Sequence, residues 1–135
     1  MAGRYIEHSP TVLIAEDEEI IRYVLEKTLG PEFKIIASVG NGEAAVRAAQ
    51  EHEPEIALLD ISLPVLNGFE AAEKIAQAKP DIKIIIVSSY VTSAQVEEAF
   101  RRGAKGYVSK GRVGDLFEAI RAVMQGQSYR PHFGR

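Results

Sequence analysis

The chain has 135 residues, of which 46% are hydrophobic, with a net charge of −3 and no cysteine. This length and apolar content suit one compact domain with one core, and the lack of cysteine excludes disulfides and thiolate metal sites. No segment approaches the roughly 18 consecutive apolar residues that a membrane-spanning helix needs, so we expect a soluble, cytoplasmic protein without membrane contact.

Charge is distributed unevenly along the chain. Residues 1–100 hold 8 basic and 17 acidic groups, whereas residues 101–135 hold 8 basic and 2 acidic groups. A basic C-terminal part is one signature of nucleic-acid binding. Here the basic residues are scattered among apolar positions of helical spacing and form no recognisable nucleic-acid motif, so a solvated face is the better interpretation.

Five β-branched apolar runs alternate with stretches of helical periodicity. The strands are predicted, in chain order, at residues 11–15, 33–38, 55–60, 82–89 and 105–109. Apolar residues at helical spacing predict helices over residues 20–29, 44–49, 69–76, 96–100 and 116–124. The strand runs are apolar at successive positions, as in parallel strands that are covered on both faces. No internal repeat or second domain is evident.

Turn and cap residues support these boundaries. Helix stops are predicted at Gly30-Pro31, Glu53-Pro54, Lys79-Pro80 and Gly126, and N-caps at Asn41, Asn67 and Thr92. The pattern is (βα)₅, which predicts an α/β fold with a doubly wound five-stranded parallel sheet. In such folds, ligands bind at the carboxyl ends of the strands.

Polar side chains follow four of the predicted strands at this edge. Glu16 and Asp17 follow the first strand, Asp60 ends the third, Ser88 ends the fourth and Lys110 follows the fifth. Two carboxylates about 4 Å apart repel each other by roughly 4 kcal/mol at an effective dielectric constant near 20. A compensating cation is therefore expected, and oxygen ligands alone favour Mg²⁺ over zinc.

A carboxylate held beside Mg²⁺, a hydroxyl and an ammonium is suited to attack a phosphoryl group. Asp60 would then become an acyl phosphate, while the metal and Lys110 neutralise charge on the transferred group. Pro64 and Gly68 are expected to shape the loop that leaves the phosphoryl oxygens accessible.

Four segments in order resemble the signatures of bacterial two-component response-regulator receiver domains: "VLIAEDE", "LLDISLPVLNGFE", "IIIVSS" and "GAKGYVSKG". The resemblance implies a flavodoxin-like sheet of strand order 2-1-3-4-5 and a receiver domain over residues 11–126. A flexible segment is expected at residues 1–10, and a C-terminal tail or the start of a linker at residues 127–135.

The resemblance also implies a role for each site residue. Asp60 is the phosphoacceptor and Asp17 is a direct ligand of Mg²⁺, for which Mn²⁺ is an alternative. Glu16 assists through a water, and Ser62 offers its backbone carbonyl to the metal. Lys110 is expected to bind phosphoryl oxygens.

A switch is implied at Ser88 and Tyr107. Ser88 also binds phosphoryl oxygens, and its inward movement lets Tyr107 turn from solvent toward the core. Ser62 and Tyr90 flank the path of the water that hydrolyses the phosphoryl group, and the bulk of Tyr90 is expected to slow that reaction. Two departures from the family pattern, Glu16 in place of aspartate and Ser88 in place of threonine, preserve the chemical group.

Each of these residues taken singly has an ordinary structural explanation, such as a helix start for Glu16 and Asp17. Three rival functions are also open. A haloacid-dehalogenase-type enzyme would need Asp-x-Asp, but Ser62 stands at the second acidic position. A flavin carrier would need a hydroxyl- and glycine-rich phosphate loop after the first strand, where the acidic segment "AEDEE" would instead repel a phosphate. An unphosphorylated interaction module fits the fold and leaves the Asp60, Asp17 and Lys110 set unexplained. The three histidines, His8, His52 and His132, fit no ligand spacing.

The expected partner is a sensor histidine kinase or a phosphotransfer protein. The closing segment "LFEAIRAVMQGQSYRP" is similar to the end of receivers in LuxR-type transcription factors. We therefore expect DNA contact only through a C-terminal domain missing from this chain, and phosphorylation-dependent homodimers. A stand-alone phosphorelay receiver is the alternative.

Overall fold

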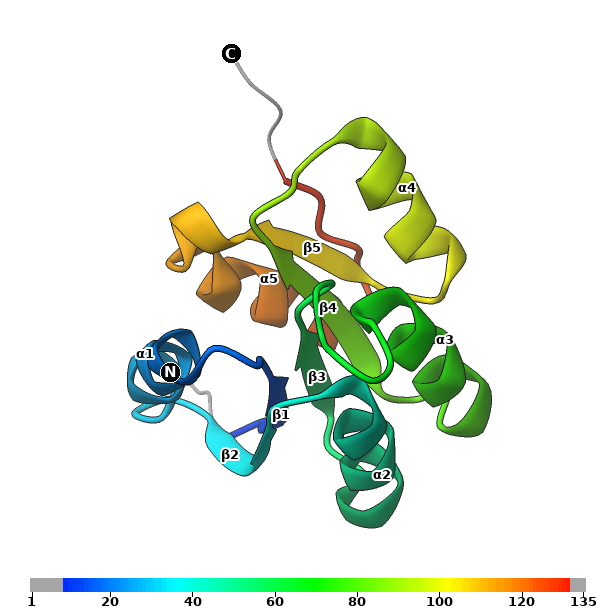
Figure 1. Cartoon of the computed structure of the whole chain (residues 1–135). Coiled ribbons are helices and arrows are strands. Elements are labelled where there is room, and N and C mark those ends of the chain that lie inside the picture. Colours follow the sequence, from blue (N-terminus) through cyan, green and yellow to red (C-terminus); the bar gives the residue numbers. More distant parts are fainter. Residues whose placement is uncertain (1–8, 132–135) are drawn as a thin grey trace.

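The structure is a computed structural model that describes residues 9–131, which form a five-stranded parallel sheet flanked by helices (Figure 1). The strands are β1 (Thr11–Ala15), β2 (Lys34–Val39), β3 (Ile56–Leu59), β4 (Lys83–Ser88) and β5 (Gly106–Ser109). The helices are α1 (Glu19–Leu29), α2 (Gly42–His52), α3 (Gly68–Ala78), α4 (Ser93–Arg101), the short 3₁₀ helix η1 (Lys110–Arg112) and α5 (Asp115–Met124). The strand order β2-β1-β3-β4-β5 confirms the predicted doubly wound topology.

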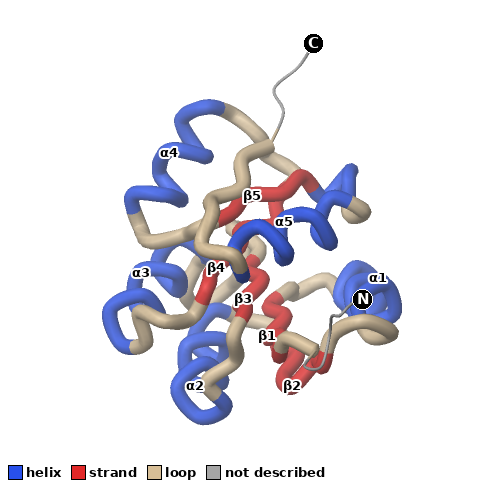
Figure 2. The backbone as a smooth tube through the Cα atoms, turned by 180° about the vertical axis from the view of Figure 1, so that it is seen from behind, coloured by secondary structure: helices blue, strands red, loops and turns tan. Residues whose placement is uncertain are grey.

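Helices cover both faces of the sheet, as Figures 1 and 2 show from opposite sides. Alternate residues of each strand point to opposite faces, so Leu13 belongs to the core under α2, α3 and α4, whereas Ile14 belongs to the core under α1 and α5. Both side chains are fully buried. The successive apolar residues of the strands are therefore explained by two cores, one on each face.

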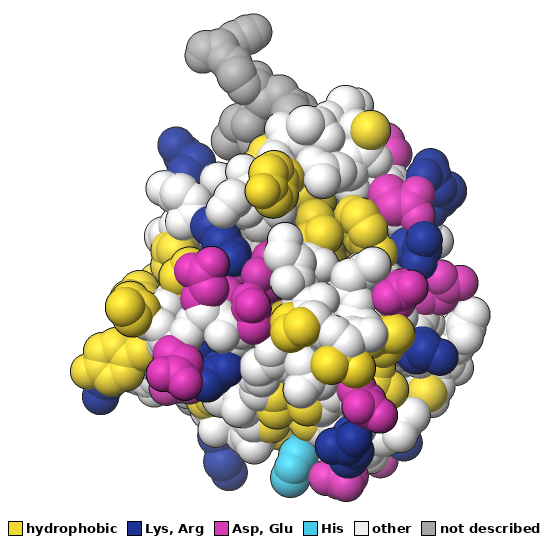
Figure 3. Space-filling view, viewed as in Figure 1, with side chains coloured by type: hydrophobic (Ala, Val, Ile, Leu, Met, Phe, Trp, Pro, Cys, Tyr) yellow, Lys and Arg dark blue, Asp and Glu magenta, His cyan; other side chains and the backbone are white. Residues whose placement is uncertain are grey.

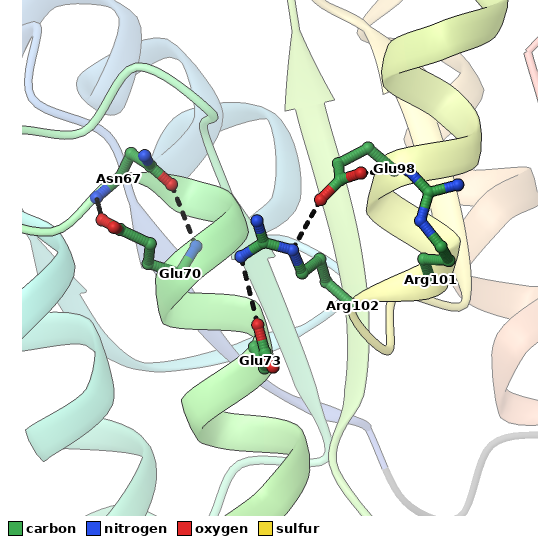
Figure 4. A network of polar contacts seen from close by, with 6 residues as sticks. All are labelled: Asn67, Glu70, Glu73, Glu98, Arg101 and Arg102. Carbon is green, nitrogen blue, oxygen red and sulfur yellow. Dashed lines mark hydrogen bonds and ion pairs between the residues drawn. The ribbon is translucent and has the colours of Figure 1, made fainter.

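The predicted N-caps are confirmed. Asn41 Oδ1 accepts a hydrogen bond from the Ala44 N–H at 2.7 Å, and Thr92 Oγ1 accepts one from the Gln95 N–H at 3.2 Å. Asn67 forms a reciprocal capping box with Glu70, which fixes the start of α3 (Figure 4). Local sequence signals therefore set where the helices that follow the site loops begin.

Helix α4 is fastened to α3 by Arg102. Its Nε lies 2.6 Å from Glu98 Oε2 of α4, and its NH1 lies 3.1 Å from Glu73 Oε1 of α3 (Figure 4). The guanidinium also lies 6.0 Å from the centre of the Phe69 ring. Only Val96 and Ala99 of α4 are buried, and Phe100 is partly buried against the same core, so this helix has a small apolar contact area.

The described part of the predicted C-terminal tail packs against the sheet. Beyond α5, the Tyr129 N–H donates to the Lys105 carbonyl at 2.9 Å, and Tyr129 forms a parallel bridge with Gly106 of β5. The predictions for residues 1–8 and 132–135, which include His8 and His132, lie outside the described residues. His52 is exposed at the end of α2.

Within residues 9–131, no helix has both the length and the apolar character needed to cross a membrane. Exposed hydrophobic side chains gather instead on α1, where Ile20, Tyr23 and Val24 project from the surface (Figure 3).

Candidate functional site

Three polar residues are buried in the described part of the chain: Glu16, Asp60 and Ser88. Each one ends or directly follows a strand, at the carboxyl edge of the sheet. Because a buried charge or hydroxyl costs free energy unless it is paired, their position together indicates a site rather than ordinary core. The sequence prediction of a polar cluster at this edge is confirmed.

The loop after β3 is built around a close backbone approach. Asp60 is tied to β1 through its N–H, which donates to the Ala15 carbonyl at 3.1 Å. The chain then folds back so that the Gly68 N–H donates to the Ile61 carbonyl at 2.9 Å. A Cβ atom at Gly68 would lie 2.2 Å from the Asp60 carbonyl oxygen, so glycine is required there.

Pro64, Val65 and Leu66 complete this loop. The Leu66 N–H donates to the Pro64 carbonyl at 2.7 Å, and Val65 between them has a φ of 71°. A β-branched residue at positive φ is a rare and strained conformation. The same Pro64 carbonyl accepts a hydrogen bond from the Gly42 N–H at 3.2 Å, which joins the loop to α2.

Lys110 connects the two buried carboxylates. Its Nζ lies 2.9 Å from Glu16 Oε1 and 3.1 Å from Asp60 Oδ2. The other Glu16 oxygen accepts the Glu18 N–H at 3.1 Å, so both oxygens of Glu16 have protein partners. The sequence does not single out Arg22, whose guanidinium donates to the Glu16 carbonyl oxygen at 2.8 Å and steadies this backbone.

These contacts shift the pKa values of Glu16 and Lys110. Burial raises the pKa of Glu16 above its ordinary value, and the hydrogen bond from Lys110 offsets part of that rise. Burial opposes the charged form of Lys110, but its hydrogen bonds to Glu16 and Asp60 outweigh this effect and raise its pKa. The ammonium is therefore the stable form of Lys110 in the site.

Asp17 and Ser62 lie at the exposed side of the cluster. Asp17 is solvent-exposed, and its carboxylate reaches within 4.8 Å of oxygens of Glu16 and Asp60. The Ser62 N–H donates to Asp60 Oδ1 at 3.3 Å. A group of oxygen ligands with one member facing solvent suits a hard divalent cation that keeps some of its waters. The cluster thus fits the predicted Mg²⁺ in ligand chemistry and spacing.

Ser88 and Tyr107 meet at the backbone of Tyr90. Ser88 Oγ accepts the Tyr90 N–H at 2.9 Å, while the Tyr107 hydroxyl donates to the Tyr90 carbonyl oxygen. Tyr107 is fully buried, so it does not have the solvent-facing position that the sequence prediction assumed before phosphorylation. Burial also raises the pKa of Tyr107, which keeps its hydroxyl protonated as a donor. The side chain of Tyr90 is 59% exposed.

Figure 3 shows acidic side chains gathered near the middle of one face of the molecule, next to a basic side chain. In sum, the structure brings Glu16, Asp17, Asp60 and Lys110 into one cluster. Ser88 and Tyr107 form a second, connected group one strand away, joined through the loop between β4 and α4. The arrangement places a buried carboxylate, an ammonium and a hydroxyl at neighbouring strand ends.

Comparisons with known proteins identify the family of this chain. The model of the response regulator receiver domain family matches residues 12–121. The transcriptional regulatory protein LnrK of Bacillus subtilis is 36% identical over 115 residues, which cover 84% of this chain and 51% of LnrK. DegU of Brevibacillus brevis, also a transcriptional regulatory protein, is 32% identical over 126 residues, 91% of this chain and 53% of DegU. The chain thus spans about half the length of these relatives.

Solved structures show the same likeness. A LuxR-family two-component response regulator from Aurantimonas sp. aligns with a TM-score of 0.86 and 28% identity, covering 90% of this chain and 89% of that one. The response regulator domain of Thermotoga maritima CheB aligns with a TM-score of 0.80 and 30% identity, covering 87% of this chain and 98% of that one.

The strand order and the match to the family model over residues 12–121 agree on one class of protein, the signalling receivers. The chain belongs to the response regulator receiver domain family, and it is a receiver of the kind found in LuxR-family two-component regulators.

The buried ion pairs of Lys110 lead to a stability prediction. Lys110→Met should lower the free energy of unfolding by about 3 kcal/mol in metal-free buffer at pH 7, because it leaves Glu16 and Asp60 buried without their cation. Adding Glu16→Gln to Lys110→Met should restore most of the loss. Urea denaturation followed by circular dichroism measures both effects.

Lys79→Met is the matched control. It removes the ion pair between Lys79 and Glu53, whose side chains are 35% and 64% exposed, and should cost less than about 1 kcal/mol. Equal losses for the Lys110 and Lys79 variants would contradict a special role for the buried pair.

Proposed function

We propose that this receiver accepts a phosphoryl group on Asp60 from the phosphohistidine of a sensor histidine kinase or a phosphotransfer protein. The observation that carries the proposal is the position of Asp60 at the end of β3, 3.1 Å from the Lys110 ammonium and beside two further carboxylates. An aspartate with a purely structural role needs no neighbouring cation. A phosphoacceptor does, because positive charge must neutralise the negative charge of the transferred group.

In the proposed step, a carboxylate oxygen of Asp60 attacks phosphorus and forms an acyl phosphate. The bond between phosphorus and the donor's imidazole nitrogen breaks, and that nitrogen keeps the electron pair. Lys110 stabilises the negative charge of the phosphoryl oxygens as they approach. In hydrolysis, a water oxygen attacks the same phosphorus, which releases phosphate and restores the Asp60 carboxylate.

Ser88 contributes the second contact to the phosphoryl group. Its Oγ accepts the Tyr90 N–H, and the Ser88 hydroxyl is also hydrogen-bonded to the side chain of Tyr107, so it is engaged before phosphorylation. Turning that hydroxyl toward a phosphoryl oxygen replaces a neutral hydrogen bond by a charge-assisted one, which is roughly twice as strong. This difference supports Ser88 as the residue that converts phosphorylation into movement of the loop between β4 and α4.

The metal ligands we propose are Asp17, Asp60 and the backbone carbonyl of Ser62, with Glu16 acting at a distance. Glu16 is engaged by Lys110 and by the Glu18 N–H, whereas the Asp17 carboxylate faces solvent and lies within 4.8 Å of the Asp60 carboxylate. A bound Mg²⁺, or Mn²⁺ in its place, would supply positive charge to the phosphoryl oxygens.

The output we propose is control of transcription, since two of the relatives are transcriptional regulatory proteins. In a longer protein, the phosphorylation state of this domain would govern DNA binding by a separate C-terminal domain. A stand-alone phosphorelay receiver is the second candidate, and it would share the chemistry at Asp60.

Phosphorylation of Asp60 can be tested directly by intact-protein mass spectrometry after incubation with acetyl phosphate and Mg²⁺. We expect one added phosphoryl group, absent from Asp60→Asn, because Asp60 is the carboxylate beside Lys110 that we propose attacks phosphorus. Asp81→Asn, which changes an exposed aspartate, should be labelled like the unchanged protein. A second residue labelled to the same extent would argue against the assignment.

Metal binding should depend on the two neighbouring acidic residues to different degrees. Asp17→Asn is expected to weaken Mg²⁺ binding in calorimetry by about tenfold or more, because it removes a direct charged ligand. Glu16→Gln should weaken binding less, because that carboxylate is already paired with Lys110. Losses of equal size, or a larger loss for Glu16→Gln, would reverse the assignment.

We predict that Tyr90 slows hydrolysis of the acyl phosphate. Its side chain stands 59% exposed, two residues beyond Ser88, where it can exclude water from one side of the phosphoryl group. Loss of the Asp60 phosphoryl group in Tyr90→Ala should be faster than in the unchanged protein under excess Mg²⁺, and an equal or slower rate would exclude shielding.

A further inference from the structure

The outer edge of β5 is covered by the chain itself. β5 is the last strand of the sheet, so no other strand pairs with this edge. Residues 127–131, called here the C-terminal segment, run parallel to it and follow β5 in Figure 1. The Tyr129 N–H donates to the Lys105 carbonyl at 2.9 Å, and the Tyr107 N–H donates to the Tyr129 carbonyl at 3.0 Å. The segment therefore satisfies backbone groups that an open edge would expose.

The two central side chains of the segment attach it to different elements. Arg130 lies against α4, with its guanidinium carbon 4.1 Å from the centre of the Phe100 ring and its NH1 2.9 Å from Glu97 Oε2. Tyr129 packs against the core on the face that α1 and α5 cover. Successive residues of an extended chain point to opposite faces of a sheet, so Arg130 contacts one face and Tyr129 contacts the other.

Hydrogen bonds connect this segment to the site. Tyr107 donates its backbone N–H to the Tyr129 carbonyl and its hydroxyl to the Tyr90 carbonyl. The Tyr90 N–H in turn donates to Ser88 Oγ, the hydroxyl proposed to contact the phosphoryl group. One residue, Tyr107, is thus bonded both to the loop that phosphorylation would move and to the segment that covers β5.

We propose that the edge of β5 is a docking site for the C-terminal segment, and that phosphorylation of Asp60 releases the segment from it. The release rests on the proposed function. When the Ser88 side chain moves toward the phosphoryl group, its Oγ moves away from the Tyr90 N–H, and the loop that leads into α4 shifts. Arg130 is held by Glu97 and Phe100 of that same helix, so a shift of α4 removes its anchor.

Release of the C-terminal segment exposes the outer edge of β5. The Lys105 carbonyl and the Tyr107 N–H lose their partners, and an unpaired strand edge accepts another extended chain readily. Phosphorylation of Asp60, at the end of β3, would thus change the outer edge of the sheet at β5, two strands away.

Docking is tested by amide hydrogen exchange of the full chain, followed by NMR at Tyr129 and Tyr107. Arg130→Ala should speed exchange at the Tyr129 amide by about 5-fold or more, since it removes both the ring contact and the ion pair. Arg47→Ala removes an exposed arginine that pairs with Glu43 on α2 and is the matched control. Equal exchange rates of the Tyr129 amide in Arg130→Ala and Arg47→Ala would overturn the docking.

Coupling is tested by adding Mg²⁺ and beryllofluoride, which stands in for the phosphoryl group. Exchange at the Tyr129 amide should rise by about 5-fold or more in the unchanged protein and stay constant in Asp60→Asn. Because coupling is reciprocal, Arg130→Ala should bind beryllofluoride several-fold more tightly than Arg47→Ala.

Chemical shifts of the Ser62 and Lys110 amides separate the two ways of failing. If these amides shift while Tyr129 exchange is unchanged or slower, the coupling is wrong and the proposed function stands. If they do not shift, beryllofluoride does not bind at Asp60, and the proposed function fails together with the coupling. Equal beryllofluoride affinities of Arg130→Ala and Arg47→Ala also overturn the coupling.

Discussion

The Lys110 ammonium between two buried carboxylates is the interaction on which the site depends. Glu16 and Asp60 are almost fully buried, and unit charges about 4 Å apart interact with roughly 4 kcal/mol at an effective dielectric constant of 20. Lys110, at 2.9 and 3.1 Å from them, converts a repulsive pair into a bridged one. With Asp17, three carboxylates stand against one ammonium, a charge balance that suits the divalent cation proposed for this site.

The apolar sheet is what makes this arrangement possible. Because helices cover both faces, the interior of the strands admits only apolar side chains, and polar groups are confined to the strand ends. Parallel strands all end at the same edge, so Glu16, Asp60 and Lys110 meet although 44 and then 50 residues separate them along the chain. The rigidity of the core fixes their spacing more firmly than the loops could do alone.

The sequence predicted the features that local chemistry determines. Strand runs, the capping residues Asn41, Asn67 and Thr92, and the polar residues at the strand ends follow from patterns within a few positions. Contacts between segments that are far apart in the chain leave no comparable pattern in the sequence. The bond between Lys110 and Glu16 depends on side-chain direction at a strand end, and the buried position of Tyr107 depends on an acceptor in the loop after β4. The short polar sequence after Gly126 resembles a tail, and only the open edge of β5 gives it a place to pack.

The position of α4 shows why a small chemical change can be transmitted. This helix buries only Val96 and Ala99, and the arginines at its borders, Arg102 toward α3 and Arg130 in the C-terminal segment, hold it through exposed or partly exposed ion pairs (Figure 4). Such pairs contribute about 0 to 1 kcal/mol each, far less than a well-buried apolar face. A charge-assisted hydrogen bond to a phosphoryl group is worth about as much as several of them. Under the proposed function, α4, which follows Ser88 after a short loop, is therefore the element whose position phosphorylation would change without disturbing the sheet beneath it.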